Sequence, residues 1–161
     1  MTVLTVRRQA GAGAVFALAV VLAALVGALA STRTAQDYAR LAQPSWAPPA
    51  WVFGPVWAAL YASIAVAGWL VWLRAGASRG RGALIAYGVQ LALNAAWTPI
   101  FFGLRQFGAA FAEVVALWLA IAVTVVLFAR IQRAAAALLL PYWAWTTFAA
   151  ALTFAVWRLN P

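Results

Sequence analysis

Residues 109–129, AAFAEVVALWLAIAVTVVLFA, form an almost wholly apolar run that holds one charged side chain, Glu113. About 20 apolar residues are enough for an α-helix to cross the hydrocarbon core of a bilayer. Arg130 and Arg133 follow the run, and arginine is typical of the point where a spanning helix reaches water. The stretch therefore predicts a transmembrane helix.

Four further runs of the same kind lie on either side of this helix. They cover residues 12–30, 51–73, 83–104 and 134–159. The connections after residue 73 are short, so consecutive helices there must be antiparallel. We expect an all-α fold, an integral membrane bundle of five transmembrane helices, in which residues 1–161 form one domain.

The first run has a second interpretation, because Ala28-Leu29-Ala30 matches the A-x-A cleavage site of a secretory signal. Four more predicted spans follow, so we favour a retained helix. The expected location is a membrane that the chain crosses several times, with a bacterial membrane favoured.

The composition of the chain agrees with a lipid environment. Hydrophobic residues make up 68% of the chain and charged residues 8%, whereas soluble domains carry roughly 25% charged residues. The net charge of +9 comes from arginines at the ends of the apolar runs. We assign them to helix anchoring rather than to nucleic-acid binding, and expect no nucleic-acid partner.

Several kinds of catalytic site are excluded by the absence of two residue types. The chain has no cysteine and no histidine, so it has no disulfide, no thiol nucleophile and no Ser-His-Asp triad. The usual zinc, iron and copper sites also need these side chains, and no metal site is expected. Conventional hydrolysis and metal catalysis are therefore disfavoured.

The only two carboxylate side chains are Asp37 and Glu113. An ionisable group at membrane depth is a functional candidate by default. Glu113 also falls in the first turns of its predicted helix, where Arg105 or the helix N-terminus could stabilise it. We favour this second, structural interpretation.

The connection over residues 31–49 contains Pro44, Pro48 and Pro49. Proline in a helix interior removes a hydrogen bond and clashes with the preceding turn, so this stretch cannot be one continuous helix. Long loops are often lids or binding loops. We expect a lid over a pocket, with Arg33 or Arg40 able to meet ligand carboxylates at its mouth.

Polar side chains inside the third predicted helix share one face. Gln90 and Asn94 are four residues apart, and Trp97 and Phe101 continue the face. Amide groups inside a bilayer need partners, so they point into the bundle or into a cavity. Interhelical hydrogen bonds and pocket lining both remain open for this pair.

Aromatic residues of the second and fifth predicted helices extend this pattern. Trp57 and Tyr61 are four residues apart, and Trp145 lies between Tyr142 and the small residue Ala149. Aromatic side chains near helix ends usually form the interfacial belt. That interpretation is favoured for the tryptophans nearest the helix ends, which are Trp46, Trp51 and Trp157.

The belt explains Trp57, Trp97 and Trp145 less well, because they lie further from the helix ends. Indole rings offer large stacking faces and one N–H donor each, which suits a flat aromatic ligand such as a porphyrin. Haem iron usually takes His, Cys, Met or Tyr as its axial ligand. With no histidine or cysteine in the chain, a metal-free tetrapyrrole fits better.

Two long segments resemble the TspO/MBR family of tryptophan-rich sensory and translocator proteins. They are PSWAPPAWVFGPVW at residues 44–57, followed by Leu60-Tyr61, and QLALNAAWTPIFFG at residues 90–103. Pro141-Tyr142 followed by Trp145 adds a shorter match. Strings of this length are far more specific than a lone short motif.

The resemblance implies five transmembrane helices, often as a homodimer, and a role in tetrapyrrole sensing, regulation or transport. It implies porphyrin binding and, in some members, binding of sterols and isoquinoline- or benzodiazepine-type drugs. No cofactor is required, and protoporphyrin IX or a related tetrapyrrole is the expected ligand. Together with Tyr61 from the aromatic pattern, the implied ligand-binding residues are Tyr38, Pro48, Trp57, Tyr61, Asn94, Trp97, Trp145 and Ala149.

An alternative activity also follows from the resemblance. Trp57 and Trp145 match two tryptophans tied to light- or oxidant-dependent breakdown of protoporphyrin IX in bacterial members, and they are the candidate catalytic residues. The chain departs from the family pattern at Asp37, where a tryptophan is usual, and at Gln43, where a lysine is usual. The C-terminal sterol motif lacks its tyrosine, which argues against cholesterol recognition.

Overall fold

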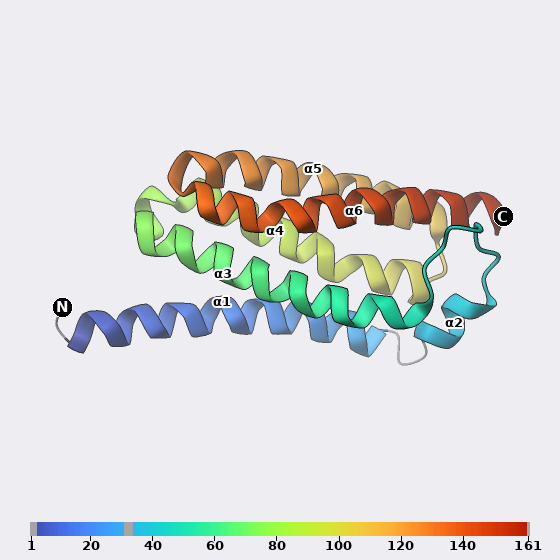
Figure 1. Cartoon of the computed structure of the whole chain (residues 1–161), viewed down its shortest axis with the longest axis horizontal. Helices are drawn as coiled ribbons and strands as arrows, with labels where there is room; N and C mark the ends of the chain where they lie inside the picture. The colour runs from blue at the N-terminus through green and yellow to red at the C-terminus, as the bar shows by residue number, and fades with distance from the viewer. Residues whose placement is uncertain (1–2, 31–33, 161) are drawn as a thin grey trace.

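The computed structural model describes residues 3–30 and 34–160, all of whose regular structure is helical (Figure 1). A 3₁₀ turn at Ala50–Val52 precedes α3, and a π-helical turn at Pro99–Gly103 continues α4. The α-helices are α1 (Val3–Ala30), α2 (Thr34–Arg40), α3 (Phe53–Arg79), α4 (Arg81–Thr98), α5 (Phe107–Ile131) and α6 (Arg133–Leu159).

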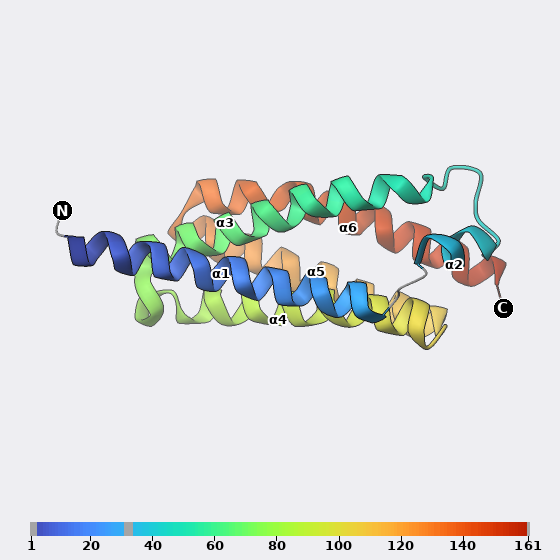
Figure 2. The ribbon, with the colours of Figure 1, turned by 90° about the horizontal axis from the view of Figure 1, so that it is seen from below.

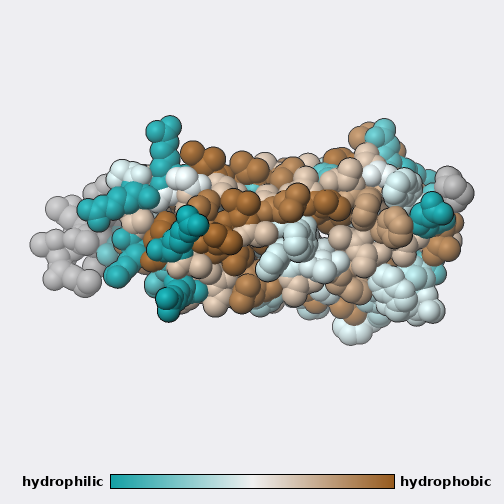
Figure 3. All heavy atoms as spheres, turned by 90° about the horizontal axis from the view of Figure 1, so that it is seen from above, coloured by the Kyte–Doolittle hydropathy of each residue, from teal (hydrophilic) through white to brown (hydrophobic). Residues whose placement is uncertain are grey.

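Five helices, α1 and α3 to α6, are long and apolar enough to cross a membrane. This confirms the predicted all-α bundle of five spans, and the chain is a multi-pass membrane protein. Figure 3 agrees, since hydrophobic side chains dominate the middle of the visible face and hydrophilic ones gather mostly toward its two ends.

The five long helices form a closed ring. Helix α1 packs on α3 and α4, α3 packs on α6, α6 packs on α5, and α5 packs on α4 (Figures 1 and 2). Because the number of spans is odd, the two ends of the described chain lie at opposite ends of the bundle. Helix α2 lies at the same end of the bundle as the C-terminus. A ring of five helices leaves room for side chains to surround an interior space.

The core lies along the inward faces of α3, α4, α5 and α6, where side chains such as Ile64, Tyr87 and Tyr142 are buried. Helix α1 is different, because much of its apolar surface faces outward and Leu29 is 76% exposed. In a bilayer this surface contacts lipid rather than water. The core therefore depends mainly on the other four spans.

The helix ends differ from the predicted ones for identifiable reasons. Helix α4 ends at Thr98 because Pro99 has no N–H, and the chain continues as a π-turn in which the Leu104 N–H bonds the Pro99 carbonyl at 2.9 Å. Helix α3 runs beyond the predicted residue 73, with a kink at Gly76, whose φ of 65° suits glycine.

The segment predicted as a loop over residues 31–49 contains the short helix α2, which was not predicted. Its prolines all come after Arg40, the last residue of α2, so they restrict only the second part of the connection. Residues 31–33 of this segment lie outside the described part of the chain.

Candidate ligand-binding site

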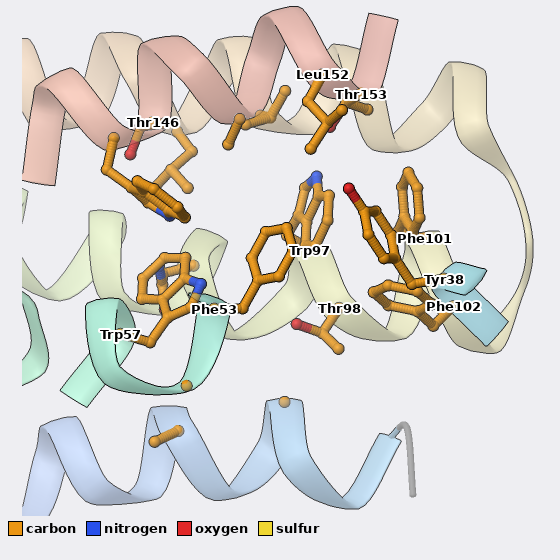
Figure 4. A pocket seen from close by; sticks show the side chains of 18 of the residues that line it. Tyr38, Phe53, Trp57, Trp97, Thr98, Phe101, Phe102, Thr146, Leu152 and Thr153 are labelled. Carbon is orange, nitrogen blue, oxygen red and sulfur yellow. The ribbon is translucent and has the colours of Figure 1, made fainter. Parts of the chain in front are cut away.

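A cavity of about 430 Å³ lies inside the bundle at the end covered by α2 (Figure 4). It is lined by residues of all five long helices as well as α2. Among the described lining residues there is no charged side chain. The aromatic lining residues are Tyr38, Phe53, Trp57, Tyr61, Trp97, Phe101, Phe102 and Trp145.

The three tryptophans of the cavity are held in place by other aromatic rings. The Trp57 ring lies 5.1 Å from that of Tyr61, and the Trp145 ring lies 5.9 Å from that of Phe53. Trp97 stacks on Phe101 with ring centroids 4.8 Å apart. Such pairs contribute about 0.5–1.5 kcal/mol each beyond area burial, so the indole faces are fixed before any ligand binds.

Asn94 forms the polar floor of the cavity. The Tyr61 hydroxyl donates to its Oδ1 at 2.9 Å, and its Nδ2 donates to the Tyr142 hydroxyl at 3.1 Å. These bonds connect α3, α4 and α6. The sequence left two roles open for Asn94, interhelical hydrogen bonding and pocket lining. In the structure Asn94 has both roles.

Gln90 lies one helical turn from Asn94 but is not among the residues that line the cavity. It is 1% exposed, and neither atom of its amide has a hydrogen-bond partner among the described residues. The shared face of Gln90 and Asn94 is thus confirmed as an inward face, with only Asn94 at the cavity.

Helix α2 and the chain after it close the end of the cavity. Tyr38 of α2 is buried, and its hydroxyl donates to the Pro48 carbonyl at 3.1 Å. The Gln43 side-chain amide donates to the Tyr38 carbonyl. Burial raises the pKa of the Tyr38 phenol above its ordinary value, so this group stays neutral and able to donate.

Two contacts fasten this lid to the rest of the bundle. Asp37 pairs with Arg105 at 3.5 Å, which joins α2 to the turn before α5. The Asn160 side chain accepts from the Ala42 N–H at 3.0 Å and donates to the Ala42 carbonyl at 2.9 Å, which joins the loop to the end of α6. The arrangement is that of a closed lid.

All the predicted ligand-binding residues except Pro48 line this one cavity. Pro48 is not a lining residue, but its carbonyl accepts the hydrogen bond from the hydroxyl of Tyr38, which is one. Of the two arginines expected at the mouth, Arg40 is exposed and does not line the cavity, and Arg33 lies outside the described residues. Whether these residues bind a ligand remains a prediction.

Several lining residues were not singled out from the sequence. Phe53 and Phe102 lie inside the two family motifs, which could have identified them. Three further lining residues share the face of Ala149 on α6 at helical spacing, which could have identified them too; they are Thr146, Leu152 and Thr153. Helix α1 contributes Ala24, Gly27 and Ala28. Small residues in an apolar run carry no signal of a site.

The preferred interpretation of Glu113 as a partner of Arg105 is wrong. Arg105 turns toward Asp37 instead, and both carboxylate oxygens of Glu113 are buried with no hydrogen-bond partner in the described part of the chain. Glu113 lies beyond the first turn of α5, which begins at Phe107, so it is also too deep to reach the free N–H groups of that helix end.

The tryptophans assigned to the interfacial belt are exposed: Trp46 by 50%, Trp51 by 74% and Trp157 by 40%. Trp57, Trp97 and Trp145 instead line the cavity. The division between the two groups agrees with the one expected from their distance to the helix ends.

The chain is similar to known proteins over most of its length. It matches the TspO/MBR family over residues 14–158. It is 45% identical to the translocator protein of Homo sapiens over 76% of this chain and 74% of the relative. It is 38% identical to protein CrtK of Rhodobacter capsulatus over 92% of each chain, and 36% identical to the tryptophan-rich protein TspO of Chlorobaculum tepidum over 90% of this chain and 95% of the relative.

Proposed function

Since this chain belongs to the TspO/MBR family, we propose that it binds protoporphyrin IX or a related tetrapyrrole in the cavity under α2, and that it acts in tetrapyrrole sensing, regulation or transport. The observation that carries the proposal is the convergence of Trp57, Trp97 and Trp145 on one uncharged cavity. Three indoles from three different helices offer stacking faces that a flat macrocycle fills.

The cavity wall supports one arrangement of such a ligand. Burying a carboxylate without a partner costs far more than stacking regains, and the described lining contains no cation. The macrocycle therefore occupies the aromatic interior, and its carboxylates stay outside the lining, in water or in the headgroup region. Arg40 is exposed at the end of α2, which places a cation at that end of the bundle.

Titration with protoporphyrin IX tests this function. In detergent or nanodiscs the porphyrin should quench tryptophan fluorescence saturably. Trp145→Phe should raise the Kd about 2- to 10-fold through the loss of an aromatic contact. Asn94→Ala should raise it by about the same factor, because it releases the Tyr61 hydroxyl that the amide holds in place at the cavity. Trp118→Phe is the control, because Trp118 lies on α5 outside the lining. No quenching of the unaltered protein would refute the function.

The second candidate function is light- or oxidant-dependent breakdown of protoporphyrin IX. It is favoured by the presence of Trp57 and Trp145 in the same cavity, where both rings can touch a bound macrocycle. That the described lining holds no charged side chain does not weigh against chemistry that begins with oxidation of an indole.

Illumination of the complex distinguishes breakdown from binding alone. The porphyrin absorbance should bleach with the native protein, and the double variant Trp57→Phe with Trp145→Phe should bleach no faster than porphyrin in detergent. Trp118→Phe should behave like the native protein. Bleaching that persists in the double variant at matched occupancy would rule out these two tryptophans as catalytic residues.

A further inference from the structure

The cavity wall is thin on one side, between the C-terminal part of α1 and the N-terminal part of α3. Ala28 of α1 and Gly54 of α3 both line the cavity and are exposed. A Cβ at Gly54 would meet nothing within 4 Å. By contrast, the wall formed by Leu152 and Val156 of α6 is buried. Ala35, at the start of α2, is a third lining residue that is exposed. Within residues 3–30 and 34–160, the cavity thus opens outward between α1 and α3, and Figure 4 shows α1 passing along this side of it.

The surroundings of this opening are apolar. Leu25 of α1, three residues before Ala28, and Ala58 of α3, four residues after Gly54, share the faces of these two residues and are exposed. Such a rim faces lipid rather than water. Since α1 ends at Ala30, Ala28 also lies close to the level at which the membrane meets water.

Helix α1 makes close contacts with α3 near its other end and with α4 beside the cavity. Near its other end, the Trp69 indole donates to the Gln9 carbonyl at 3.1 Å, and a Cβ at Gly68 would lie 2.7 Å from the Phe16 ring. On the side of α4, a Cβ at Gly27 would lie 3.3 Å from the Thr98 hydroxyl oxygen. The seam between α1 and α3 is therefore closed at one end and open at the cavity.

The lid offers a harder route to the same cavity. A ligand passing under α2 would have to separate the Asp37–Arg105 ion pair, the bond from Tyr38 to Pro48, and the two bonds between Asn160 and Ala42. Beside the cavity, no hydrogen bond or ion pair joins the described residues of α1 and α3, so passage there requires only that the two helices separate.

Resting on the proposed function, we infer that the ligand reaches the cavity sideways from the bilayer, through the opening between Ala28 and Gly54. The site then selects flat molecules that partition into the boundary layer of the membrane. The ring slides between the helices, and its charged groups remain in the headgroup region. Molecules dissolved only in water are not taken up by this route.

Narrowing the opening tests this inference. The double variant Ala28→Phe with Gly54→Phe adds two rings at the opening and no new tryptophan. Stopped-flow quenching with protoporphyrin IX supplied in phosphatidylcholine vesicles should show association and dissociation both slowed by about tenfold or more, the effect of a barrier raised by about 1.4 kcal/mol. Val21→Phe, exposed on α1 away from the lining, should leave both rates unchanged.

A cross-link between α1 and α3 tests the lateral route within one folded sample. The chain has no cysteine, so Ala28→Cys with Gly54→Cys can be joined by a short bismaleimide, and the rates before and after linking compared. Linking should slow both rates, whereas Asp37→Asn, which loosens the lid, should not accelerate them. Unchanged rates after linking, or faster association in Asp37→Asn, would overturn the lateral route. Absence of quenching in the unlinked protein would instead refute the proposed function.

Discussion

Ala149→Phe is expected to weaken protoporphyrin IX binding by about 10- to 100-fold. Overpacking a filled site costs about 1–3 kcal/mol, and each step of about 1.4 kcal/mol lowers the affinity about tenfold. Ala149 lines the cavity on α6, one helical turn from Trp145. A benzyl group at this position would occupy the space beside the indole that the macrocycle needs. The measurement is the Kd from tryptophan quenching.

Ala151→Phe is the matched control, because Ala151 lies on the same helix but is exposed and outside the lining. It should bind porphyrin as the native protein does. Equal affinity of Ala149→Phe and the native protein would mean that the macrocycle does not occupy the cavity.

Gly68→Leu should lower the stability of the bundle by about 1–3 kcal/mol or more, the usual range for overpacking. A Cβ at Gly68 would lie 2.7 Å from the Phe16 ring and 2.8 Å from the Tyr87 ring. Phe16 belongs to α1 and Tyr87 to α4, and their rings already contact each other at 5.6 Å. The larger side chain would therefore push α1 and α4 away from α3.

Thermal unfolding in detergent, followed by circular dichroism, measures this effect as a lowered Tm. The control is Gly88→Leu on α4, where an added Cβ meets nothing within 4 Å. A helix interior favours leucine over glycine, so the control should keep or raise the Tm. If Gly68→Leu kept the native Tm, the close meeting of α1, α3 and α4 would be contradicted.

The spans could be predicted because lipid imposes one strong condition. Every backbone polar group in the bilayer must bond internally, so an apolar run such as residues 109–129 has to be helical. Hydropathy does not determine which helices are neighbours. The ring order, in which α1 contacts α3 and α4 while α6 lies between α3 and α5, depends on packing details such as the absent side chain at Gly68.

The site was predictable where its residues are unusual for a membrane. Asn94 stood out because it is an amide in an apolar helix. Trp57 and Trp145 stood out because they are indole side chains that lie away from the helix ends. Ala28 gave no signal, because its contribution is the space that it leaves open. Gly54 stands inside the first motif, as Phe53 does, but nothing in the motif says that it borders an opening. The lid contacts of Asp37 and Asn160 join segments far apart in the chain, and sequence spacing cannot predict such pairs.

A structure of the protein with protoporphyrin IX bound tests most directly whether three indoles from separate helices face one ligand. The macrocycle should lie in the cavity under α2, in contact with Trp57, Trp97 and Trp145, with its carboxylates directed to the mouth. A macrocycle bound on the outer surface of the helices, with the interior space left unfilled, would contradict this arrangement.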